Sequence, residues 1–127
     1  MLAGSLVAAC QSLPAPAVPV TGTFGGQHVS LTLGPTGGSL AYDCAAGSID
    51  EPVIPDRDGR FRVRGTHIPG HGGPERVGEL NPAFPATYEG RADGGRLSLI
   101  VRVVSTGEVV GQFTLRLDAE PMLTRCL

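Results

Sequence analysis

A two-residue alternation of apolar and polar side chains between positions 86 and 117 constrains this chain more than any other feature of its sequence. Successive side chains of a β-strand point to opposite faces, so this period assigns one apolar set to the inner face of each strand. Two glycine-containing turns divide the segment, at Asp93-Gly94-Gly95 and Ser105-Thr106-Gly107-Glu108. The segment therefore predicts three antiparallel strands, whose inward residues are Leu97, Leu99, Val101, Val103, Val109, Gly111, Phe113, Leu115 and Leu117.

The composition extends this β prediction to the whole chain. Nineteen glycines and eleven prolines in 127 residues interrupt any long helix, and this length is typical of one domain. The net charge is −2, and the sequence shows no basic cluster and few aromatic residues, which excludes a nucleic-acid-binding surface. All ten basic residues are arginines, so the chain has no lysine for a Schiff base or a Walker-type phosphate site.

Further strands are predicted on both sides of the meander. Residues 27–33 and 39–44 form a hairpin whose inward side chains are Val29, Leu31, Leu33, Leu40, Tyr42 and Cys44. Residues 60–65 form a strand with Phe61 and Val63 inward and arginines outward, 48–54 are at best an edge strand because Pro52 interrupts them, and 121–127 form a closing strand. Six to eight strands in sequential hairpins predict an all-β fold, namely a small antiparallel up-and-down β-barrel, because closure removes exposed edges; a β-sandwich is the alternative.

The N-terminus resembles a bacterial lipoprotein signal peptide. An apolar run ends in small residues directly before a cysteine, Val7-Ala8-Ala9-Cys10, and in that family the cysteine carries the lipid. The run is short and no Lys or Arg precedes it, which we interpret as a translation start upstream of Met1. A proline-rich stretch follows, which favours polyproline II and suits a tether. We expect residues 1–10 to be the remnant of the signal peptide, 11–21 the tether and 22–127 a single β domain.

Most of the domain resembles an uncharacterised group of small bacterial envelope proteins without an assigned activity. The likeness runs from about Gly22 to the C-terminus and rests on Asp43-Cys44-Ala45-Ala46-Gly47-Ser48-Ile49-Asp50, Gly59-Arg60-Phe61, Gly65-Thr66-His67, Gly72-Gly73-Pro74, Tyr88-Glu89-Gly90 and Cys126-Leu127. Gly22-Thr23-Phe24 also resembles the Gly-x-Trp start of lipocalin-like barrels, with Phe24 in place of Trp. The resemblance implies an exported protein with disulfide pairing.

Two cysteines remain if Cys10 carries lipid. Cys44 and Cys126 are an even pair for the oxidising compartment that the resemblance implies, so we expect them to form a disulfide. It would close a loop of roughly 80 residues, worth about 4 kcal/mol in the chain-entropy model. The alternatives are two buried free thiols or a nucleophile at Cys44, although no local Cys-His signature accompanies it.

The segment 65–85 contains four prolines and five glycines and shows neither period, which predicts a long irregular loop. We place the candidate ligand site there, at His67, His71, Glu75 and Arg76. Two imidazoles and a carboxylate four residues apart also form a candidate Zn²⁺ set, His67, His71 and Glu75, although the glycines and Pro69 argue against the helix that would align them. The stretch Asp56-Arg57-Asp58-Gly59 is similar to the start of a calcium loop, but a turn in which Asp56 bonds its own backbone explains it more simply.

Two classes of function follow. The first is a lipid-anchored, exported module of the bacterial cell envelope, on its periplasmic or extracellular face, whose barrel or loop binds a small molecule, glycan or protein without catalysis, without a cofactor and without nucleic acid. The alternative is a small metal-dependent hydrolase centred on His67 to Glu75. The first is favoured because no nucleophile elbow, phosphate loop or catalytic carboxylate pair is present in the sequence.

The lipoprotein motif yields a direct prediction. Expressed in a bacterial host from an extended upstream start, the protein is expected to fractionate with membranes, and Cys10→Ser is expected to release it, because multiple acyl chains at this cysteine would supply the anchoring. Immunoblotting of the membrane and soluble fractions measures the effect. Unchanged membrane partitioning of the Cys10→Ser variant would rule out a lipid at Cys10.

Overall fold

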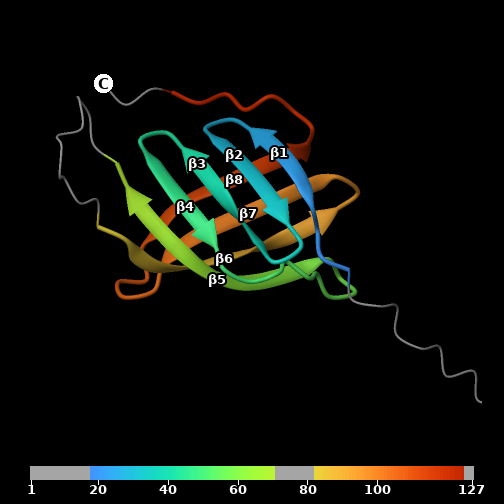
Figure 1. Cartoon of the computed structure of the whole chain (residues 1–127), viewed down its shortest axis with the longest axis horizontal. Helices are drawn as coiled ribbons and strands as arrows, with labels where there is room; N and C mark the ends of the chain where they lie inside the picture. The colour runs from blue at the N-terminus through green and yellow to red at the C-terminus, as the bar shows by residue number, and fades with distance from the viewer. Residues whose placement is uncertain (1–17, 71–81, 125–127) are drawn as a thin grey trace, which may run out of the picture.

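A computed structural model describes residues 18–70 and 82–124 of the chain. This part of the chain forms eight antiparallel strands and no helix: β1 (Gly22–Gly26), β2 (Val29–Gly34), β3 (Gly37–Tyr42), β4 (Ala45–Ile49), β5 (Arg60–Pro69), β6 (Phe84–Asp93), β7 (Arg96–Val103) and β8 (Val109–Leu117). Each strand pairs with its neighbour in sequence and β8 pairs with β1, so the sheet closes into an up-and-down barrel (Figure 1). The predicted barrel is confirmed, and the closed strand order excludes the sandwich.

The strand order places the connections alternately at two ends of the barrel. We call one the His67 end: it carries the connections 27–28, 43–44 and 104–108, the end of β5 and the start of β6. The other, the Arg96 end, carries the connections 35–36, 50–59 and 94–95, and the chain enters β1 and leaves β8 there. Figure 1 shows the two ends on opposite sides, with the chain entering β1 at the lower right and the tip of β5 at the left.

Apolar side chains fill the barrel. Sixteen buried residues form one cluster, and the inward sets of β2 and β7 match the alternation in the sequence, since Val29, Leu31, Leu33, Leu97, Leu99, Val101 and Val103 are all buried. On β5, Phe61 and Val63 point inward and the three arginines of residues 60–64 are exposed, as predicted. An eight-stranded barrel is just wide enough for side chains to fill its interior. The barrel interior is therefore a packed core of side chains.

Two tyrosines cross the interior where glycines leave room for them. The Tyr88 hydroxyl donates to the carbonyl oxygen of Thr66 at 2.6 Å and lies 3.1 Å from the Tyr42 hydroxyl. Because Tyr88 has used its one proton, Tyr42 donates to Tyr88. A Cβ atom on Gly47 would lie 2.2 Å from the Tyr88 oxygen, and one on Gly65 would lie 2.7 Å from the Tyr88 ring. Glycine at these two positions is what lets both rings stay inside the barrel.

The sequence analysis missed one strand and misassigned two other segments. The first strand, β1, was not predicted, because GTFGG has three glycines and no alternation. It nevertheless closes the barrel, because it pairs with β8 and places Phe24 opposite Leu117. The strand predicted at 121–127 does not close the barrel. Its described residues, 121–124, contribute one isolated β-bridge, between Gln27 and Met122. The segment 48–54 is not an edge strand, since β4 pairs on both sides and ends at Ile49.

Strand β8 departs from simple alternation at a bulge. Val101 faces Gly111 and Arg102 faces Val109, so Val110 has no opposite partner. The extra residue turns Val110 toward the core and leaves Val109 40% exposed. The sequence alternation predicted the reverse, with Val109 inward and Val110 outward. Leu117 was also expected inward but is 44% exposed, because it lies at the last position of the strand.

The segment after β8 runs back along the barrel to the His67 end. Met122 exchanges backbone hydrogen bonds with Gly26 and His28, and the Thr124 N–H donates to a carboxylate oxygen of Asp43 at 2.5 Å.

Cys44 is not inward as expected: it is exposed in the two-residue turn after β3, with φ of 59°. Cys126 lies outside the described residues, so its disulfide with Cys44 stays a prediction, which non-reducing peptide mapping would check.

The packing around the tyrosines predicts a position-specific effect of alanine. Gly47→Ala is expected to lower the free energy of unfolding by about 1–3 kcal/mol, the usual range for overpacking, because the new methyl group would overlap both hydroxyls. Gly34→Ala is the matched control, since its Cβ would meet only the carbonyl oxygen of Gly37 at 3.6 Å. Urea unfolding measures both changes. Equal stability of the two variants would contradict this account of the interior.

Candidate functional site

An apolar pocket of about 360 Å³ opens at the His67 end. Four connected elements line it: the end of β5, the start of β6, the turn after β7 and the start of β8. Its residues are His67, Pro69, Phe84, Val103, Ser105, Thr106, Glu108 and Val110. Phe84 remains 38% exposed at the rim, whereas Val103 is buried at the base. The volume lies within the range of small-molecule sites, which are mostly apolar with few polar groups.

The local structure explains why these side chains meet. His67 and Val103 are the last inward-facing residues of β5 and β7, and they lie where the barrel interior opens at the His67 end. His67 pairs with Phe84 across β5 and β6. The bulge in β8 adds Val110 to the same wall. The pocket is therefore the unfilled end of the barrel core.

His67 is the polar group at the base of this pocket. The residue is only 7% exposed, its ring centroid lies 5.8 Å from that of Tyr42, and its buried Nδ1 atom has no hydrogen-bond partner among the described residues. Burial lowers the pKa of His67, and the Glu108 carboxylate opposes this shift more weakly. The imidazole is therefore neutral near pH 7.

The tyrosines behind His67 do not supply an acid or a base. Burial is the main cause that raises the pKa of both Tyr42 and Tyr88, and their mutual hydrogen bond further raises the pKa of Tyr42. Both hydroxyls stay protonated at ordinary pH. Tyr42 also stacks on Phe113, with ring centroids 5.5 Å apart and planes 4° apart. The Tyr42 ring therefore packs near both His67 and Phe113.

A smaller hollow lies beside the pocket and shares Val110 with it. Its lining includes a hydrogen-bonded pair of polar residues, His28 and Asp43. It is lined by His28, Tyr42, Asp43, Ala45, Val110, Gly111 and Phe113. The ring nitrogen Nδ1 of His28 is bonded to the Asp43 carboxylate, which links the turn after β1 to the turn after β3. The Thr124 N–H is the main cause that lowers the pKa of Asp43, and His28 adds to it. This pair joins three segments of the barrel rim.

The structure corrects the expected site in one respect. His67 belongs to a paired strand rather than to a loop, because β5 continues to Pro69 and β6 begins at Phe84. His71, Glu75 and Arg76 lie outside the described residues, so the zinc set they would form with His67 is untested. Within residues 18–70 and 82–124, no three His, Cys, Asp or Glu side chains are placed to hold a metal ion.

The turn at Asp56 agrees with the simpler explanation of its sequence. One carboxylate oxygen of Asp56 accepts hydrogen bonds from the backbone N–H groups of Asp58 and Arg60, each at 2.9 Å. Gly59 has φ of 82° and donates its N–H to the Asp56 carbonyl. The carboxylate therefore stabilises a turn.

Sequence reasoning missed most of the pocket. Phe84, Ser105, Thr106, Glu108 and Val110 come from segments that were expected to be loop, turn or outer face. One signal was available: in an up-and-down barrel every second connection lies at the same end, which brings the turn after β7 beside the end of β5.

Comparison of the chain with protein-family models, with curated proteins and with solved structures finds no match. Among the described residues, no helix is long and apolar enough to cross a membrane.

The burial of His67 predicts its titration. Its pKa is expected below the ordinary value of 6.5, because the charged imidazolium would lose hydration in the apolar pocket. The unfolded chain then binds more protons between the two pKa values, so His67 lowers stability as the pH falls from 6.5 toward the folded-state pKa. Imidazole NMR shifts followed against pH give the midpoint. Consistently, His67→Gln should lose less stability than the wild type on acidification; a midpoint at or above 6.5 would contradict the burial argument.

Proposed function

We propose that this protein is a lipid-anchored, exported module of the bacterial envelope that binds a small apolar molecule in the pocket at its His67 end, without catalysis. The observation that carries the binding proposal is an apolar pocket with His67 at its base, whose buried Nδ1 atom has no hydrogen-bond partner among the described residues. An unsatisfied buried polar atom costs about 1–3 kcal/mol. A ligand with one polar group would remove that cost.

The shape and lining of the pocket define the ligand class. Pro69, Phe84, Val103 and Val110 offer apolar contact, and His67 offers one polar contact at the base. The rim adds the polar residues Ser105, Thr106 and Glu108. These features fit a compact ring or short chain that carries a single hydroxyl or carbonyl group at its buried end.

The hydroxyl groups of the pocket are not arranged for nucleophilic catalysis. Thr106 Oγ1 accepts a hydrogen bond from the Glu108 N–H at 3.2 Å, which stabilises the turn, and His67 Nδ1 bonds no hydroxyl within the part of the chain that the structure describes. A hydroxyl nucleophile requires a base within hydrogen-bond reach. Binding without reaction is therefore the better-supported activity.

The position of the N-terminal segment is consistent with anchoring. The chain enters β1 at the Arg96 end, opposite the pocket. Val20 donates its N–H to the Val53 carbonyl at 2.8 Å and packs against the core, so the barrel contacts begin two residues before β1. A lipid at Cys10 would thus hold the barrel with its pocket directed away from the membrane.

The hydrogen bond between Thr124 and Asp43 brings the C-terminal segment toward Cys44, which supports the proposed disulfide between Cys44 and Cys126.

A matched pair of probes tests the binding site. We expect 4-methylphenol to shift the backbone NMR signals of the pocket and to bind about tenfold more tightly than toluene, because only the phenol can hydrogen-bond His67. His67→Phe should remove the preference for the phenol while toluene binding persists.

Two further variants locate the effect. Phe84→Ala should weaken both probes, because its ring lines the pocket, whereas Ile54→Ala, an exposed apolar residue in the 50–59 connection at the other end, should change neither. Equal affinity for the two probes, or signal changes away from the pocket, would refute the proposal.

A further inference from the structure

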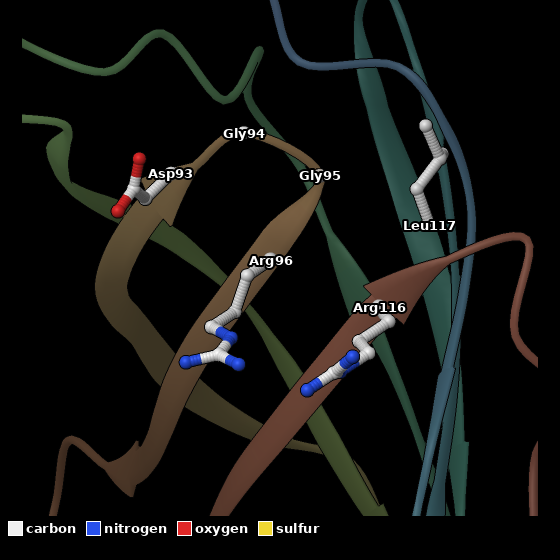
Figure 2. Close-up of a pocket in the computed structure, with 6 residues that line it drawn as sticks. All are labelled: Asp93, Gly94, Gly95, Arg96, Arg116 and Leu117. Carbon is white, nitrogen blue, oxygen red and sulfur yellow. The ribbon is translucent and has the colours of Figure 1, made fainter.

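Another concavity, of about 570 Å³, lies at the Arg96 end, and two neighbouring arginines line it. Arg96, the first residue of β7, faces Arg116 of β8 directly in the strand register. Figure 2 shows both side chains extending in the same direction from neighbouring strands, with their guanidinium groups adjacent. The other lining residues are Asp93, Gly94, Gly95 and Leu117.

Neither of these guanidinium groups has a partner among the described residues. Other arginines do: Arg64 pairs with Glu51, Arg102 pairs with Glu89, and Arg91 donates to the Asp58 carbonyl. Like charges directly opposite on neighbouring strands destabilise a sheet. Asp93 lies opposite Arg96 in the register of β6 and β7, but it forms no ion pair with a described residue, and in Figure 2 its carboxylate points away from both arginines. The exposed Asp118, which follows β8, forms no ion pair within the described part of the chain either. The site thus holds two adjacent positive charges that an anion would neutralise.

We propose that Arg96 and Arg116 together bind the phosphate group of an anionic ligand. A guanidinium group presents a planar fork of N–H donors that matches two oxygens of a phosphate, and two such forks on one face can bind a doubly charged group. The turn beside them leaves open access, because Gly94 and Gly95 have φ of 53° and 87°, carry no side chains, and a Cβ on Gly94 would meet nothing within 4 Å.

The surroundings of the site suggest two sources for this phosphate. Val20 and Thr21, the residues just before β1, line a hollow that also includes Gly94, Gly95 and Arg96. In the anchored protein proposed above, this end faces the membrane, and an anionic phospholipid headgroup is the source. A free phosphate compound is the other source. Only the assignment to the membrane rests on the proposed anchoring; the phosphate site itself does not.

The full chain carrying Cys10→Ser, which cannot bear lipid, is the material for the test. Its melting temperature is measured in sodium phosphate and in sodium chloride of equal ionic strength. Arg96→Gln and Arg116→Gln should each weaken apparent phosphate binding about tenfold or more, and the double variant should lose it. Arg62→Gln, which removes an exposed arginine without a described partner from β5, is the matched control and should bind phosphate as before. Because phosphate stabilises proteins generally, the difference between variants is the readout.

Sedimentation with vesicles separates the two sources. Binding to phosphatidylglycerol vesicles but not to phosphatidylcholine vesicles, lost in the double variant, supports the headgroup source; response to inorganic phosphate without vesicle binding supports a free phosphate compound. If the double variant responds to phosphate and to both vesicles as the Arg62→Gln control does, the phosphate site is overturned. Release of the natural protein by Cys10→Ser tests the anchoring separately, so the two proposals can fail independently.

Discussion

The hydrogen bond from Tyr88 to the Thr66 carbonyl is the contact on which the barrel interior depends. It links a fully buried ring on β6 to the backbone of β5, and Tyr42 extends it to β3. Buried hydroxyls without partners would destabilise the core, so the two tyrosines need each other as well as this carbonyl. The glycines at 47 and 65 follow from the same constraint, because any side chain there would occupy the space of the rings.

This filled interior determines where ligands can bind. A packed core leaves ligand sites to the barrel surface, and the hollows at its two ends differ in chemistry. The His67 end combines apolar side chains with a buried imidazole, whereas the Arg96 end presents two adjacent arginines beside the start of β1. Among the described residues, His67 Nδ1 has no hydrogen-bond partner and neither arginine forms an ion pair. An apolar ligand and an anion would therefore bind at opposite ends, and neither site would obstruct the other.

His67 shows how the local sequence can assign a residue to the wrong type of element. Its presence among prolines and glycines suggested a polar loop, because the local sequence after Gly65 shows no strand period. In the barrel, β4 and β6 supply partners on both sides of β5, and this pairing extends the strand to Pro69 despite the weak local pattern. Hydrogen bonds to neighbouring strands override local propensity, which is why strand ends are poorly predicted from one sequence.

The sequence by itself determined the all-β class, the three-stranded meander, the glycine turn at 93–95 and the inward faces of β2, β5 and β7, because a period of two and the conformational needs of turns are local properties. Only the tertiary structure decided the strand β1, the bulge at Val110, the exposed turn position of Cys44 and the juxtaposition of His67 with Phe84 and of Arg96 with Arg116. Each of these depends on the register between strands and on closure of the barrel, and such pairings join residues that are far apart in the chain.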